Sequence, residues 1–252
     1  HENFSQRWNY LFGEKKGLLD PTLPEFRSAA SISDLDSYSR EYKVEGFFGQ
    51  VTADYMDKYY ASASLRRDGS SIFHPDHRWG TFWSIGGNWR ISKEAFMEDV
   101  KWVDNLSLKL SYGQQGNDNI LSGGVSNYYL WQSLYDLGWP NSNQIGGLVS
   151  SLENQAVSWE KNGNLNVGIE ATLLNSRLTV NAEYYNRKTV DMLLSYPMAT
   201  STGFNGYNAN VGDMRNSGFE FEVRGTAIKT DDFTWNISLM GSTVKNKVLK
   251  LT

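Results

Sequence analysis

The stretch LNVGIEATL, residues 165–173, alternates strictly between two kinds of side chain. Every odd position from Leu165 to Leu173 is apolar, whereas the even positions hold Asn, Gly, Glu and Thr. Successive side chains of a β-strand point to opposite faces, so a period of two predicts a strand with one apolar and one hydrated face. This pattern directs the reading of the rest of the chain.

The same alternation recurs along the sequence. The stretch LTVNAEYYNR, residues 178–187, is apolar at its even positions as far as Tyr184 and mostly polar between them. The contrast is clear again in three other segments and weaker in three near the beginning. We therefore expect about eight strands, at residues 47–55, 59–67, 82–91, 106–112, 165–173, 178–187, 219–227 and 233–239.

The connections between these segments alternate in length. Residues 57–58, 175–176 and 230–232 are tight polar turns, and the longer connection 92–104 on the same side has room for a short helix near 93–98. The intervening connections 68–80, 117–158 and 191–216 are long and rich in Gly, Asn and Ser. This arrangement is typical of an outer-membrane β-barrel, whose long loops face outward. We expect an all-β fold, a transmembrane antiparallel up-and-down β-barrel, of which this chain is a partial wall.

The composition agrees with a wall between lipid and water. Aromatic residues make up 14% of the chain although the mean hydropathy is −0.50. A barrel that alternates lipid-facing and water-facing side chains accounts for both values. There are no cysteines, which excludes disulfides and thiolate metal sites, and a net charge of −4 gives no support to nucleic-acid binding.

The alternation also assigns faces. Aromatic residues near both strand ends suggest two belts at the lipid headgroups. We expect Tyr55, Tyr59, Trp89, Phe233 and Trp235 in the belt toward the short turns, and Phe47, Trp83, Tyr112, Trp159, Tyr184 and Phe219 in the belt toward the long loops. Lipid should contact Leu165, Val167, Ile169, Leu178, Val180, Phe221, Val223 and Ile237. The lumen should receive Asn166, Glu170, Glu183, Arg187, Glu222 and Arg224.

Short motifs stand at the ends of these expected strands. In chain order they are RRDGSSIF at residues 66–73, RWG at 78–80, WRIS at 89–92, SWEK at 158–161, YYNRKTVDML at 184–193, NVGDMRNSGFE at 210–220 and NKV at 246–248. Together they resemble the barrel signature of the SusC/RagA family of TonB-dependent outer-membrane receptors. Asn88 stands where that family usually has Gly.

The resemblance implies active import of a nutrient, a glycan or a peptide, across the outer membrane. Such transporters have barrels of about 22 strands with a plugged lumen. Residues 1–252 are then expected to be a fragment of the barrel domain that opens inside an outer loop, with the plug domain and the remaining strands absent. The resemblance further implies a TonB-contacting segment and plug upstream, and a SusD-like surface lipoprotein over the outer mouth.

The loop at residues 117–158 holds the candidate substrate-binding side chains. They are Tyr128, Tyr129, Trp131 and Trp139, with Tyr135 nearby, among many Asn, Ser and Gly residues. Aromatic rings beside amides suit stacking of a sugar or peptide, and they equally suit contact with a protein lid. A third reading is that these rings pack on other loops. The sequence leaves the three readings open.

Other chemistry finds little support. His74, Asp76 and His77 form an incomplete metal site, and Glu220 and Glu222 are same-face neighbours on a wet strand rather than an acid/base pair. We expect no enzyme activity, no cofactor and no metal. Two alternatives stay open, namely a soluble β-sandwich carbohydrate-binding module and a small autonomous outer-membrane barrel. The first requires the apolar faces to be packed between two sheets, and the second requires the sheet to close on itself.

Overall fold

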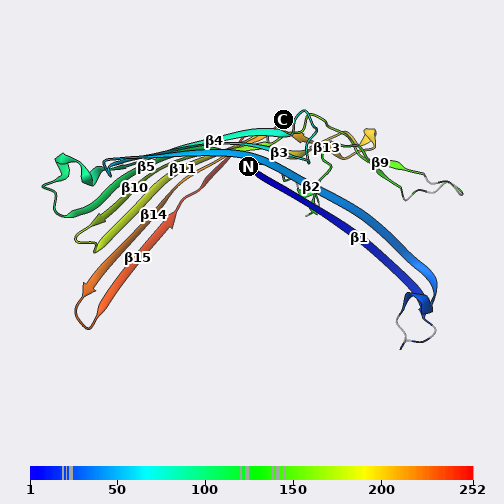
Figure 1. The fold of residues 1–252 in the computed structure, drawn as a ribbon, viewed down its shortest axis with the longest axis horizontal. Helices are drawn as coiled ribbons and strands as arrows, with labels where there is room; N and C mark the ends of the chain where they lie inside the picture. The colour runs from blue at the N-terminus through cyan, green and yellow to red at the C-terminus, as the bar shows by residue number, and fades with distance from the viewer. Residues whose placement is uncertain are drawn as a thin grey trace.

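A computed structural model gives the fold of residues 1–251 (Figure 1). For Leu121, Ser122, Val125 and Ser126 it describes the backbone alone. Thr252 and a few residues inside the chain are outside the description: Leu19, Pro21, Leu23, Pro24, Ile120, Gly123, Gly124, Gly138, Pro140, Asn141, Asn143 and Ile145.

One antiparallel sheet of ten strands dominates the molecule (Figure 1). Strands that follow one another in this sheet are hydrogen-bonded neighbours, so the chain runs up and down. In spatial order they are β1 (Glu2–Leu18), β2 (Ala29–Tyr55), β3 (Tyr59–Ser70), β4 (Trp79–Arg90), β5 (Val103–Asn117), β10 (Glu160–Leu173), β11 (Leu178–Val190), β14 (Asp213–Lys229) and β15 (Thr234–Ser242), with β16 (Lys245–Lys250) also paired to β14.

The long connections fold into three small hairpins. These are β6–β7 (Leu121–Ser122 and Val125–Ser126), β8–β9 (Leu134–Asp136 and Leu148–Ser151) and β12–β13 (Leu193–Pro197 and Gly206–Asn210). Four 3₁₀ helices complete the described elements: η1 (Phe26–Ser28), η2 (Ile91–Lys93), η3 (Ala95–Met97) and η4 (Thr200–Thr202). The short helix expected near residues 93–98 is therefore a pair of 3₁₀ turns. Among the described residues, no helix has the length and apolar character needed to span a bilayer.

All eight expected strands are present, and their ends at the short turns agree to within three residues, the largest difference being at β5, which begins at Val103 instead of residue 106. The sequence reading missed β1 and the first part of β2, which pair along most of their length. Figure 1 shows this hairpin leaving the bundle of other strands on the side opposite the short turns. The chain therefore opens in a regular β-hairpin on the long-loop side. The reading also missed β16, which continues the register of β15 along β14 after a break at residues 243–244.

The register places the apolar residues of neighbouring strands on one face. Val180 lies opposite Val223, which in turn lies opposite Leu239. These side chains remain open on that face: Ile169 is 42% exposed, Phe221 is 45% exposed and Ile237 is 48% exposed. None of the eight residues expected to contact lipid is buried. The β-sandwich alternative is therefore wrong, because it requires these side chains to be packed between two sheets.

The sheet is not closed within the part of the chain that the structure describes. Its edges are β1 and β15, and the strand that contains Phe47 does not pair with the strand that contains Ile237. A small autonomous barrel would need that pairing. The described residues thus form an open wall, as expected for part of a larger barrel.

At the short-turn end, Glu94 ties two turns together. Its carboxylate accepts hydrogen bonds from the Tyr59 hydroxyl at 2.5 Å, the Trp89 indole at 3.0 Å and the Lys58 ammonium at 3.1 Å. These three bonds, led by that of Tyr59, lower the pKa of Glu94 to about 2. Arg90 adds an ion pair with Asp57 across the same two turns. The residues of the WRIS motif and the glutamate two positions beyond it therefore fasten the β2–β3 turn to the end of β4.

A charged side chain should destabilise the fold far more on the lipid-facing side of the wall than on the inner face. Val180→Arg puts a charge on the lipid face near the bilayer midplane and should cost about 2–4 kcal/mol. Asn181→Arg points to the other face, opposite Glu222 and Glu170 in the register, and should cost much less. Folding titrations of the full-length protein into lipid vesicles measure both values, and equal costs would contradict the assigned faces.

The contribution of Glu94 to stability should depend on pH. Its folded pKa lies below the unfolded value of about 4.5, so its stabilisation is complete above that pH and is lost as the pH falls toward 2. Glu94→Gln should therefore lower the resistance of the full-length protein to chemical unfolding at pH 7, with a difference that shrinks between pH 4.5 and 2. Glu98→Gln in the same connection is the control, because Glu98 is exposed. An effect of Glu94→Gln that is the same at every pH would refute this role.

Candidate functional site

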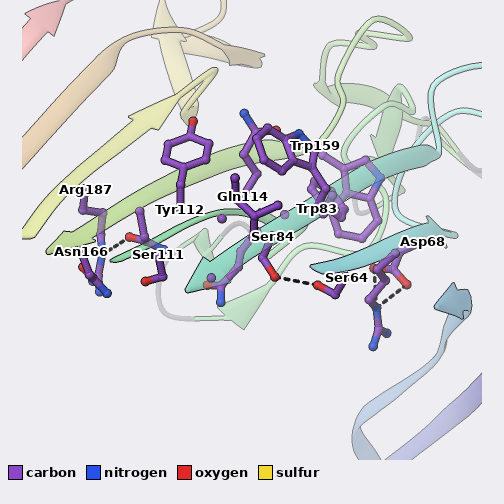
Figure 2. A pocket seen from close by; sticks show the side chains of 18 of the residues that line it. Ser64, Asp68, Trp83, Ser84, Ser111, Tyr112, Gln114, Trp159, Asn166 and Arg187 are labelled. Carbon is purple, nitrogen blue, oxygen red and sulfur yellow. Dashed lines mark hydrogen bonds and ion pairs between the residues drawn. The ribbon is translucent and has the colours of Figure 1, made fainter. Parts of the chain in front are cut away.

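The polar face of the wall is hollowed near its long-loop end. The hollow has a volume of about 840 Å³ and is lined by residues of β3, β4, β5, β10 and β11. In Figure 2, Ser111 and Asn166 point to the side of the sheet opposite Tyr112. This division matches the register, in which Ser111 pairs with Asn166 and Tyr112 pairs with Leu165. We call the face that carries Ser111 and Asn166 the inner face.

Small hydroxyl and amide side chains form the floor of this hollow. The hydroxyls of Ser64 and Ser84 lie 2.7 Å apart, and the Arg187 Nε donates to Asn164 Oδ1 at 2.7 Å (Figure 2). Gly113 keeps the floor flat, since a Cβ there would lie 2.9 Å from the Cβ of Ser84. Short side chains leave the space open, and their donors and acceptors suit a solute with many hydrogen-bonding groups.

Toward the short turns the inner face carries several charged side chains. Lys109 forms an ion pair with Glu170, and Arg224 bonds Glu222 at 2.6 Å. Glu183 and Glu220 lie directly opposite each other in the β11–β14 register. Adjacent like charges weaken a sheet unless water or a cationic partner lies between them. The inner face therefore combines hydroxyl and amide groups with charges of both signs near the long loops, and it becomes mainly acidic toward the short turns.

A hydrogen-bonded group closes the outer end of the hollow. Asp118 Oδ2 accepts from the Tyr42 hydroxyl at 2.9 Å and from the Ser70 hydroxyl at 2.6 Å. Burial, followed by the charge of Asp118, raises the pKa of Tyr42, which stays a neutral donor. Three elements far apart in the sequence, β2, the end of β3 and the segment after β5, meet here. This junction fixes the outer rim of the hollow.

The RRDGSSIF motif supplies most of the neighbouring contacts. Arg66 Nε donates to both oxygens of Asp68 at 2.8 and 2.7 Å, and Arg66 Nη2 reaches Glu2 Oε2 at 2.8 Å. Asp68 is buried and fills the space beside Gly46, where a Cβ would lie 2.4 Å from its Oδ1. The motif thus joins β3 to the β1–β2 hairpin. This role could not be predicted from the motif alone, because Gly46 and Glu2 lie far from it in the sequence.

The buried apolar core lies at the long-loop end of the wall, where loop residues pack on Phe82 of β4. Trp159 packs against Phe73 and Phe82, with ring centroids 5.4 Å apart in each case, and its indole donates to the Arg78 carbonyl at 2.8 Å. Trp159 is 7% exposed, so its assignment to the aromatic belt was wrong. It precedes β10, where the alternation of faces does not apply. The remaining buried members of this rim core are Ile72, Leu130, Val157 and Leu193.

The inner face of the β1–β2 hairpin is rich in aromatic rings. Tyr10 stacks on Tyr38 with centroids 4.8 Å apart, and the Arg40 guanidinium lies 4.5 Å from the Tyr38 ring. Tyr10 and Tyr38 are about 40% exposed, at 41% and 42%. Alternation in SYSREY at residues 37–42 and in FSQRWNYLF at 4–12 could have indicated these strands. Neither segment is among the eight strands expected from the sequence.

The four candidate substrate residues lie in two kinds of environment, packed against other side chains or exposed. Tyr128 stacks on Trp8 at 5.3 Å and packs against the rim core, while the Tyr129 hydroxyl donates to the Ser39 carbonyl at 3.4 Å. Trp131 meets the His74 ring edge-on at 4.9 Å. Trp139, by contrast, is 57% exposed. The packing reading thus gains support for three of these rings, and Trp139 stays a candidate for stacking with a ligand.

The histidines and the acidic pair have ordinary structural surroundings. The His74 ring packs on Trp131, and its Nδ1 lies 3.5 Å from Asp76 Oδ2 at the surface. Within the described residues, no three His, Cys, Asp or Glu side chains gather as metal ligands. Glu222 is engaged by Arg224. The groups available at the hollow can bind and orient a solute through hydrogen bonds.

Comparison with known proteins agrees with this geometry. Residues 2–247 match the family described as TonB dependent receptor-like, beta-barrel. The TonB-dependent receptor P26 of Formosa agariphila is 35% identical over 212 residues, which cover 83% of this chain and 21% of that protein. The TonB-dependent receptor SusC of Bacteroides thetaiotaomicron is 30% identical over 235 residues, covering 88% of this chain and 22% of SusC.

Solved structures show the same architecture. The RagAB peptide transporter superposes with a TM-score of 0.85 at 26% identity, over 99% of this chain and 30% of the matched chain. The present chain spans about a fifth of the length of the curated relatives. Its amphipathic open wall, its motifs and these matches agree: the chain belongs to the TonB-dependent receptor β-barrel family of the outer membrane, with SusC and RagA-type transporters among its homologues.

Proposed function

We propose that this chain forms part of the barrel wall and outer rim of an active importer of glycans or peptides. The observation that carries the proposal is the hollow of about 840 Å³ on the polar face of a wall whose other face is apolar. A lipid-embedded sheet with a hydrated, hollowed inner face suits the passage of a polar solute. Members of this family are transport proteins, and the proposal includes no bond chemistry.

The open edges support a larger barrel. Among the described residues, the free edges at the level of the bilayer are residues 47–55 of β2, which pair only with β3, and β15, and their N–H and C=O groups cannot face hydrocarbon without partners. Further strands must therefore complete the ladder on both sides. We propose that residues 1–252 are one section of a barrel domain whose other strands and plug belong to the same protein.

The substrate class follows from the groups at the hollow and rim. Hydroxyls and amides line the floor, and the charged lining residues Arg66, Asp68, Asp118 and Arg187 are hydrogen-bonded to protein groups. The exposed Trp139 ring lies in the long loop that follows β5. Such a surface suits a neutral solute with many hydroxyl or amide groups, which describes both glycans and peptides. Among the relatives, RagAB is described as a peptide transporter. Uptake measurements with both classes of solute distinguish the two.

Two partners fit the ends of the wall. The β1–β2 hairpin extends beyond the other strands on the long-loop side and carries exposed residues such as Tyr10 and Leu11, which suits contact with a SusD-like surface lipoprotein acting as a lid. On the inner face, Glu183 and Glu220 lie opposite each other, and neither forms an ion pair among the described residues. A plug domain with basic side chains would neutralise them, and TonB would act on that plug.

Removing an exposed ring of the long loop should weaken uptake. Trp139→Ala in the full-length protein is expected to reduce the affinity for the imported solute about tenfold, the equivalent of about 1.4 kcal/mol for a lost stacking contact. Leu137→Ala is the matched control, because Leu137 lies in the same loop and is 65% exposed. Uptake of labelled oligosaccharides and oligopeptides by cells that lack the chromosomal copy measures both variants.

The two panels of solutes also decide the substrate class. If cells take up only oligosaccharides or only oligopeptides in a way that requires this protein, that class is the substrate. If deletion of the gene abolishes uptake and the wild-type protein restores it, the protein is the importer. Failure of the wild-type protein to restore uptake of any member of either panel would refute the proposed function. Equal effects of Trp139→Ala and Leu137→Ala would refute the stacking role alone.

A further inference from the structure

Beyond the lumen, the outward face of the wall carries an ordered group of cations at its long-loop end. Lys188 of β11 lies opposite Arg215 of β14, which lies opposite Lys247 of β16. Lys245 is one step nearer the membrane on β16, opposite Ser217. Positions alternate regularly between faces along these strands, so all four side chains share the face of Val180, Val223 and Leu239. We call these four residues the basic row.

On three neighbouring strands, the outward-facing side chains change in the same order toward the basic row. Along β14 the outward positions are Val223, Phe221, Phe219, Ser217 and Arg215. The neighbouring strands repeat this order, from apolar through hydroxyl or amide to cationic groups. On β11 the outward residues are Val180, Ala182, Tyr184, Asn186 and Lys188. Along β15, the break and β16 they are Leu239, Gly241, Thr243, Lys245 and Lys247. An amphiphile whose acyl chains lie against the apolar part presents its headgroup to the cations.

The charge of the basic row is poorly compensated within the protein. Lys188 Nζ lies 3.8 Å from Asp213 Oδ2, a distant ion pair. In the part of the chain that the structure describes, Arg215, Lys245 and Lys247 form no ion pair, and all of them are exposed. Like charges placed directly opposite each other destabilise a sheet. Three adjacent cations at one level therefore favour a bound anion.

The position of the row identifies which anion fits. It lies four residues, or about 13 Å along the strand, beyond the Tyr184–Phe219 pair of the outer aromatic belt. Lysine and arginine stems can reach back toward the interface from this height. At the same level on β10 and β5 the outward residues are Gly163 and Gln114, which carry no charge. The nearest other outward cations, Lys161 on β10 and Arg67 on β3, already have partners, since Lys161 pairs with Asp191 and Arg67 lies over the Trp79 ring. The uncompensated cations at this level therefore belong to the basic row.

We propose that the basic row binds the phosphate groups of an outer-leaflet membrane lipid whose acyl chains lie on Phe219, Phe221 and Val223. Arg215 can hold a phosphate through two parallel N–H bonds, and the lysines add point charges on either side. Basic clusters beside a membrane surface bind anionic headgroups in this way. The site lies on the outer surface of the wall, so it is separate from the solute path through the lumen.

Lipid binding to the purified protein tests the proposal. The full-length protein in detergent is titrated with a diphosphorylated, acylated glucosamine disaccharide, with its dephosphorylated form and with inorganic phosphate. The triple variant Lys188→Gln, Arg215→Gln, Lys247→Gln should bind the phosphorylated lipid at least tenfold more weakly than wild type. The control Lys101→Gln, Arg177→Gln, Lys229→Gln removes three exposed cations at the short-turn end and should stay within about twofold of wild type.

A charge-preserving variant shows whether a loss of lipid binding comes from the missing charge or from misfolding. The double variant Lys188→Arg, Lys247→Arg should keep the wild-type affinity, and both sets of variants should show the same resistance to unfolding in lipid-free detergent. Equal binding of phosphorylated and dephosphorylated lipid, unchanged binding by the triple variant, or full competition by inorganic phosphate at the lipid concentration would each overturn the proposal. Solute uptake is measured separately, so loss of lipid binding with normal import leaves the proposed transport function intact.

Discussion

The backbone hydrogen-bond ladder is the constraint on which the rest of this structure depends. In hydrocarbon no water can satisfy N–H and C=O groups, so each strand of the wall must pair on both sides. From β3 to β14 every strand has two antiparallel neighbours in register, for example β11 between β10 and β14. The register then fixes which side chains meet lipid and which meet water, since a slip of one residue would exchange the two faces.

A wall of single-sheet thickness cannot contain a conventional core. Apolar side chains such as Ile169 and Phe221 stay exposed until lipid covers them. The buried apolar residues are instead gathered at the rim, where Phe73 and Trp159 of two loops pack with Phe82 of β4. Loops outside the bilayer need their own packing to hold a shape, because they lack the continuous ladder of the wall. The family motifs fall at these junctions for that reason.

The two ends of the wall are fastened by different means. At the short turns, Glu94 gathers three donors and Arg90 pairs with Asp57, so polar contacts fix compact turns. At the long loops, the Tyr42–Asp118–Ser70 group and the rim core join segments that are far apart in the chain. The inner face between them becomes mainly acidic toward the short turns, while the outer face runs from apolar residues to the basic row. The proposed solute, lipid and partner surfaces thus lie on separate parts of one sheet.

The sequence by itself determined the wall, because alternation such as that at residues 165–173 follows directly from the pleat of a strand. It also placed the short turns and the family motifs correctly. Only the tertiary structure revealed the β1–β2 hairpin, the burial of Trp159, the packing of Tyr128 on Trp8, and the alignment of Lys188, Arg215 and Lys247. These features depend on contacts between distant segments and on the register across strands. A period of two within one strand carries no information about its neighbours.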